Sequence, residues 1–169
     1  MSSAQLVKPL EKSTNKFVGA PLKRREDAVL VSGHGIYVDD VKFSGMLFAA
    51  ILRSSYAHAR IKKVDLSAAI ESPGVVLALS GEQISRDTKP LPLSVTLPWM
   101  KKTEVYMLAN EKVHFTGEAV AVVLATDRYL AEDAFEKIQV EYEPLDSVND
   151  AEKSLEKDAP RLYDKWDSN

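Results

Sequence analysis

Residues 46–65 read MLFAAILRSSYAHARIKKVD, and this stretch indicates the fold class. Its first seven residues, Met46–Leu52, form an apolar run that follows Gly45. The run is too short for a helix buried on every side, so it predicts a strand buried on both faces. From Ala59 onward apolar and polar residues alternate imperfectly, which predicts a second strand with one exposed face.

A polar turn separates these two predicted strands. Arg53, Ser54, His58 and Arg60 are its candidate residues. Such a cluster beside an apolar strand is either a turn held by side-chain hydrogen bonds or a part of a site. We expect mainly a structural turn.

Composition places the chain among ordinary globular proteins. Its 169 residues suit a single domain that buries roughly 70% of its unfolded surface. Hydrophobic residues make up 45%, charged residues 28%, and the net charge is −3. The densest basic cluster, Lys23–Arg25, is followed at once by Glu26 and Asp27. We therefore expect no nucleic-acid partner.

The sequence contains no cysteine, which excludes disulfides, iron–sulfur ligation and a cysteine nucleophile within it. Residues 1–16 are polar and aperiodic, and we expect a mobile tail without a secretory leader. No apolar run approaches the ~18 residues needed to span a bilayer. These features predict a soluble, cytoplasmic protein that does not insert into membranes.

Periodicity and turn residues divide the chain into residues 17–148, the expected α+β domain, and residues 149–169, a C-terminal extension. The expected elements, in chain order, are a helix at 24–31, a turn capped by Asp39–Asp40, strands at 46–52 and 59–64, a helix at 65–71 capped by Asp65 or Ser67, a strand at 75–79, an irregular segment at 85–103, a strand at 118–126, an amphipathic helix after Asp127, a strand at 138–143 and a short helix at 151–155.

The irregular segment at 85–103 contains three prolines together with Trp99 and Met100. Prolines interrupt regular hydrogen-bond ladders, and a long loop within a small domain is usually functional or mobile. We expect its apolar residues to pack against another surface, such as a second chain. Trp166, in the C-terminal extension, is the third candidate interface residue.

Residue types that carry chemistry are present but not grouped. His34, His58 and His114 lack the spacing that would direct two of them at one metal ion, so we expect no metal site. The Ser54–Ser55 pair near His58 lacks a motif for nucleophilic catalysis. Glu118, at the entry to a buried strand, is expected to be a solvated carboxylate rather than a cleft residue. The sequence thus predicts no self-contained catalytic or cofactor-binding residues.

Several segments together resemble one family. They are Gly33–Asp40, Gly45–Ile61 with its RSSYAHARI string, Pro73–Val75, Leu108–Val123 and Val140–Leu145. In order and spacing they are similar to the N-terminal domain of the large, molybdenum-binding subunit of the xanthine oxidase, aldehyde oxidase and carbon monoxide dehydrogenase family. The resemblance implies an α/β-hammerhead fold, with a mixed β-sheet and packed helices.

The resemblance also implies partners and cofactors outside these residues. In that family a longer C-terminal region binds the molybdopterin cofactor and supplies a catalytic glutamate, while further subunits carry iron–sulfur clusters and FAD. The sequence then represents a non-catalytic domain or split subunit that shapes a substrate funnel. The alternative is a stand-alone interaction or regulatory module with the same fold. A small hydrolase using Ser54 or Ser55 with His58 is the least favoured interpretation.

Overall fold

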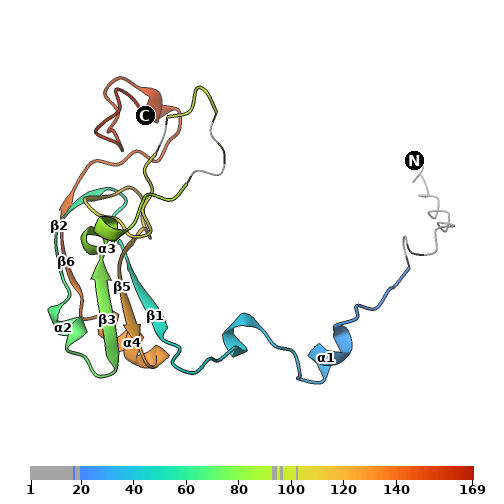
Figure 1. Cartoon of the computed structure of the whole chain (residues 1–169). Coiled ribbons are helices and arrows are strands. Elements are labelled where there is room, and N and C mark those ends of the chain that lie inside the picture. Colours follow the sequence, from blue (N-terminus) through green and yellow to red (C-terminus); the bar gives the residue numbers. More distant parts are fainter. Residues whose placement is uncertain (1–16, 18–19, 93–94, 96, 102) are drawn as a thin grey trace, which may run out of the picture. The chain divides into compact units, whose positions relative to one another are not determined.

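The structure is a computed structural model that describes residues 17, 20–92, 95, 97–101 and 103–169. The expected tail at residues 1–16 lies outside this described part. The chain divides into two units, Met1–Phe43 and Ser44–Asn169 (Figure 1). The expected boundaries at residues 17 and 148 stay predictions.

The first unit contains a short helix and a helical turn, in agreement with the sequence. Helix α1 spans Asp27–Val31, and Gly33 follows it with φ +77°, a conformation that favours glycine. The 3-10 helix η1 spans Val38–Asp40. At its start the Asp40 carboxylate accepts a hydrogen bond from the Tyr37 amide at 2.9 Å, so this acidic residue caps its own turn as predicted.

The second unit is built on two three-stranded sheets, of strand order β1-β5-β3 and β4-β2-β6. The strands are β1 (Phe48–Arg53), β2 (Ala59–Asp65), β3 (Val75–Ser80), β4 (Lys112–Val113), β5 (Ala119–Ala125) and β6 (Gln139–Pro144). Every strand pair recorded within the described residues is antiparallel. The single mixed sheet that we expected is thus divided into two antiparallel sheets, and β4 was not predicted.

Strand β1 is less buried than its sequence indicated. Ala50 is the one buried residue of the strand, and Ile51 is 41% exposed. The reason is its position at the edge of a sheet whose inner face is covered by helix α4 (Arg128–Phe135). The expectation of burial on both faces is therefore wrong for this chain.

Helix α4 forms where the amphipathic pattern predicted it. The Asp127 carboxylate caps it by accepting from the Tyr129 amide at 2.8 Å. Its buried Ala134 packs in one core with Ala121 and Val123 of β5. Val120 has no partner in the pairing of β5 with β1, and it packs in a separate core against the second sheet.

Among its described residues this unit also contains two further helices and one helical turn. They are α2 (Ser67–Ile70), α3 (Gly81–Asp87) and η2 (Lys153–Leu155). The N-cap residue of α2 is Leu66, which makes no side-chain cap hydrogen bond, so the expected cap at Asp65 or Ser67 is wrong. The Asp65 carboxylate does accept a hydrogen bond from the Ser67 amide just before the helix. Helix α3 was not predicted, although Ser80 and Gln83 form a reciprocal capping box at its start.

Candidate functional site

The polar turn between β1 and β2 is held by hydrogen bonds to its own backbone and to a neighbouring loop. The Ser54 hydroxyl donates to the Tyr56 carbonyl at 2.9 Å and accepts from the Tyr56 amide at 3.0 Å. The Ser54 backbone pairs with Glu118 and Gly117, each at 2.8 Å. Arg53 donates to the Gly117 carbonyl at 2.9 Å. The turn thus fixes the loop that precedes β5.

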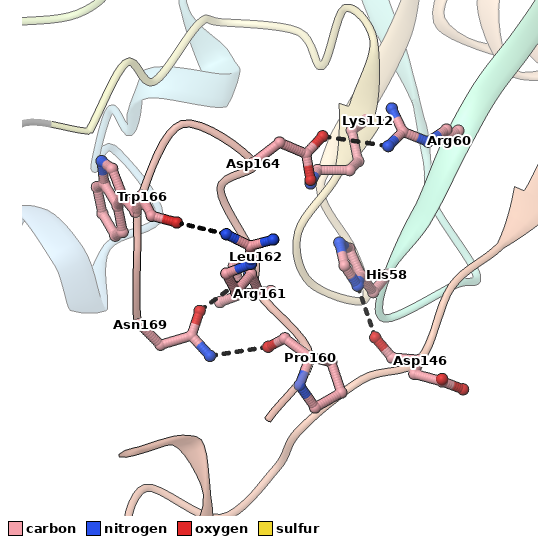
Figure 2. Close-up of polar contacts among 10 residues, drawn as sticks. All are labelled: His58, Arg60, Lys112, Asp146, Pro160, Arg161, Leu162, Asp164, Trp166 and Asn169. Atoms are coloured by element: carbon pink, nitrogen blue, oxygen red, sulfur yellow. Dashed lines mark hydrogen bonds and ion pairs between the residues drawn. The ribbon is translucent and has the colours of Figure 1, made fainter. Parts of the chain in front are cut away.

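His58 ties the same turn to the chain that follows β6. Its Nδ1 lies 2.7 Å from the Asp146 carbonyl, and since a carbonyl only accepts, Nδ1 carries the proton (Figure 2). The His58 carbonyl accepts from the Leu145 amide at 2.9 Å. His58 is 5% exposed, and its buried Nε2 contacts no hydrogen-bond partner among the described residues. No hydrogen bond is recorded there between His58 and Ser54, so the two do not form a nucleophile–base pair.

Asp164, in the C-terminal extension, joins two cationic side chains of the second sheet. Its carboxylate lies 3.1 Å from Lys112 Nζ and 3.2 Å from an Arg60 guanidinium nitrogen. The hydrogen bond from Lys112 holds the pKa of the Asp164 carboxyl below its ordinary value, with a further contribution from Arg60. Lys112 is the buried partner, because its side chain is 8% exposed whereas that of Asp164 is 59% exposed.

Asn169 and Arg161 close the C-terminal extension upon itself (Figure 2). The side-chain carboxamide of Asn169 accepts a hydrogen bond from the Leu162 backbone N–H at 3.0 Å and donates one to the Pro160 carbonyl at 2.8 Å. Arg161 donates to the Trp166 carbonyl at 3.1 Å. These contacts give an irregular segment a defined loop conformation.

Aromatic rings join this loop to the segment between β4 and β5. His114 stacks on Tyr163 with ring centroids 4.7 Å apart, and Tyr163 contacts Trp166 at 4.4 Å. The Glu118 carboxylate accepts from the His114 backbone, and its side chain is only 16% exposed. The expectation of a solvated Glu118 is therefore wrong. Burial, followed by the Glu118 charge, raises the pKa of Tyr163.

Two surface cavities border the extension. A cavity of about 420 Å³ is lined by Glu118, His114 and Trp166, among others. A smaller one of about 240 Å³ is lined by His58 and Arg161. Arg60 and Asp164 line both. Because cationic and anionic groups already pair there, these cavities resemble gaps beside a docked segment more than a prepared ligand pocket.

The three candidate interface residues differ in their surroundings. Trp99 is 80% exposed and Met100 is 37% exposed. Trp166 is half-buried, since it packs on Tyr163 and the Lys101 ammonium lies 5.2 Å from its ring centroid.

Sequence reasoning missed Lys112 and Asp164 as partners. Each is a single charged residue in a segment without periodicity, and they are 52 positions apart. No local sequence pattern predicts such a contact. Glu118 gave a signal of a site residue, because it lies directly after a glycine and before an apolar strand. This position was interpreted as that of a solvent-exposed carboxylate.

A family model described as the aldehyde oxidase and xanthine dehydrogenase a/b hammerhead domain matches residues 32–146. This chain belongs to that family. The hammerhead fold expected from the sequence is confirmed, with the polar turn, both sheets and α4 inside the matched range.

Similar proteins are considerably longer than this hammerhead domain. The carbon monoxide dehydrogenase large chain of Afipia carboxidovorans is 47% identical over 86% of this chain and 17% of its own length. The nicotine 6-hydroxylase large subunit of Paenarthrobacter nicotinovorans is 36% identical over 85% of this chain and 18% of its own.

Solved structures agree with this relationship. Quinoline 2-oxidoreductase from Pseudomonas putida 86 gives a TM-score of 0.81 at 41% identity, covering 88% of this chain and 19% of that one. A Cu,Mo carbon monoxide dehydrogenase gives 0.75 at 43% identity, covering 84% and 17%. The hammerhead domain therefore spans less than a fifth of the length of each of these four relatives.

Proposed function

We propose that this chain is a non-catalytic domain of a molybdenum hydroxylase, which shapes the substrate funnel and assembles with a molybdopterin-binding part. The complete enzyme would oxidise carbon monoxide, an aldehyde or an N-heterocycle. The observation that supports this most is the use of His58 and Glu118 in hydrogen bonds that hold loops together. Family membership supports the reaction class, and these contacts support a non-catalytic role for the chain.

Two observations bear on the metal-containing redox groups of such an enzyme. The sequence has no cysteine for an iron–sulfur cluster. Within the described ranges no three His, Asp or Glu side chains come together as metal ligands. We propose that the molybdopterin-binding part of the large subunit holds the molybdopterin cofactor, that an iron–sulfur subunit and an FAD subunit hold the other redox groups, and that no chemical step falls to the residues of this domain.

Trp99, Met100 and Trp166 remain our proposed contacts with those partners. The exposure of Trp99 supports this, because a large apolar ring in water gains free energy when a partner covers it. None of the helices in the described part of the chain is long and apolar enough to cross a membrane. We propose a cytoplasmic location for the assembly.

Native mass spectrometry of the protein purified gently from its source cells tests this function. The expected result is a large assembly that contains molybdenum, iron–sulfur clusters and flavin, and oxidises one of the three substrate classes. The chain alone, or a simple oligomer of it without metal, would contradict the proposal and favour a stand-alone interaction module.

A further inference from the structure

The β1-β5-β3 sheet has two apolar faces, and α4 covers one of them. Residues directly opposite one another in antiparallel strands point to the same face. The pairing therefore aligns two rows of three side chains on the face opposite α4. We call these six residues the open face: Ala49, Leu124 and Leu77 in one row, and Ile51, Val122 and Leu79 in the next.

The open face is apolar and partly in contact with solvent. Ile51 is 41% exposed and Leu77 is 42% exposed, and none of the six residues is polar or charged. The second sheet offers a contrast within the same molecule. Its exposed positions carry charges, such as Lys62 paired with Glu143 at 2.6 Å.

The strand sequences indicate that both faces of the first sheet are buried in the complete protein. Strand β5 reads AVAVVLA without a polar residue, whereas β6 reads QVEYEP and alternates. Alternation is typical of an antiparallel sheet with one face in water, and a continuous apolar run is typical of a sheet covered on both faces. Helix α4 is one cover, so the sequence of β5 requires a second.

We propose that the open face is the docking surface for the remainder of the molybdenum-binding large chain, which presents an apolar surface to it. This inference rests on the proposed function and adds the residues through which the domain assembles. The relatives support this occupant, because more than four fifths of the carbon monoxide dehydrogenase and quinoline 2-oxidoreductase chains lies outside the matched region. The absence of charge on the open face also suits this apolar occupant, since burial of the open face leaves no ion unpaired.

Hydroxyl-radical footprinting of the chain alone and of the assembly isolated from source cells tests the proposal. Ile51 and Leu77 should lose most of their reactivity in the assembly. Ile70 is the matched control, because it is 52% exposed and lies on α2, whose Ala69 packs in the core on the α4 side of the sheet. It should react alike in both samples.

The outcomes separate this inference from the proposed function. If an assembly forms while Ile51 and Leu77 stay fully reactive, the open face is not the docking surface, but the proposed function stands. If no assembly with a molybdenum-binding part exists, both fail. If protection occurs in a homo-oligomer of this chain alone, a second copy covers the face and the inference is overturned.

Substitutions give an independent readout. Ile51→Lys should weaken assembly roughly tenfold or more, because it introduces a charge where the partner excludes water. Ile70→Lys should assemble as the wild type does, and both isolated variants should unfold near the wild-type temperature because both positions are exposed. Equal assembly of the two variants would contradict the proposal.

Discussion

Lys112 and Asp164 form an ion pair in which one partner is buried and the other is exposed. The Lys112 side chain is 8% exposed and lies 3.1 Å from the Asp164 carboxylate, which is 59% exposed. Burying the Lys112 ammonium costs desolvation free energy, and its attraction to the Asp164 carboxylate offsets this cost. Because Asp164 belongs to the C-terminal extension, this contact fastens the extension to the second sheet.

Asp164→Asn should therefore loosen the extension and leave the rest of the fold intact. The expected cost is about 1 kcal/mol, small because Asp164 is exposed yet measurable because Lys112 is not. Hydrogen exchange at residues 160–169 should accelerate, while exchange in β5 stays unchanged. Adding Lys112→Met should restore part of the lost free energy of unfolding, since it removes the unpaired buried charge, but it should not restore the protection of the extension. Unaltered exchange in Asp164→Asn would show that the pair does not hold the extension.

The lowered pKa of the Asp65 carboxyl predicts that the protein loses stability in acid. Hydrogen bonds from the Ser67 hydroxyl and amide, and then from Lys63, lower its pKa from 3.8 to about 2. A group whose pKa is lower in the folded state stabilises the fold above its unfolded pKa, and this stabilisation is lost as pH falls toward its folded pKa. In urea unfolding, Asp65→Asn should reduce stability at pH 5 and differ progressively less from the wild type between about pH 4 and pH 2.

Asp133→Asn is the control for that titration. Asp133 is exposed on α4, with no hydrogen bond or ion pair recorded to a described residue. Unfolding of this variant is measured over the same pH interval for comparison. A difference between Asp65→Asn and the wild type that is independent of pH would contradict the predicted linkage.

Local patterns predicted the elements that depend on neighbouring residues. Strand β5, helix α4 and strand β6 follow from an apolar run, a stripe of apolar residues after Asp127, and an alternation ended by Pro144. Each signal lies within about ten residues, the range over which periodicity operates. The burial of β1 was mispredicted because the number of covered faces depends on surfaces that its own sequence does not contain.

The candidate site depends on contacts that are distant in sequence. His58 was recognised as a polar residue in a turn, but its partner is the Asp146 carbonyl, 88 positions away. Helix α3 was missed because its seven residues contain a single large apolar side chain, Ile84, and therefore no stripe. Its signal was the capping pair Ser80 and Gln83.

Ser80→Ala should destabilise the protein by about 1 kcal/mol through the loss of this cap. The Ser80 hydroxyl accepts from the Gln83 amide, and the Gln83 side chain accepts from the Ser80 amide at 2.9 Å. Thermal unfolding of Ser80→Ala, Gln83→Ala and the double variant measures the coupling. The double variant should lose less than the sum of the single losses, because each hydrogen bond depends on the other. Strict additivity would show that the two bonds act independently.

Gly81 is constrained by space. A Cβ atom there would clash with the Ala109 carbonyl oxygen, which belongs to the backbone and cannot rotate away. Gly81→Ala should therefore separate α3 from the segment that precedes β4 and cost about 3 kcal/mol or more. Gly45→Ala is the control, because nothing lies within 4 Å of the added atom and only the φ of +75° is unfavourable.

The Gly45 variant should lose about 1 kcal/mol, the cost of a left-handed conformation with a side chain. Chemical denaturation of both variants measures the difference, and hydrogen exchange at Ala109 and Asn110 should increase only in Gly81→Ala. If both variants lost the same free energy, or if exchange at residues 109–110 stayed slow, the backbones of α3 and this segment would not be in close contact. The Glu118 loop would then be oriented by its hydrogen bonds to Ser54, Arg53 and His114 and not by this close approach.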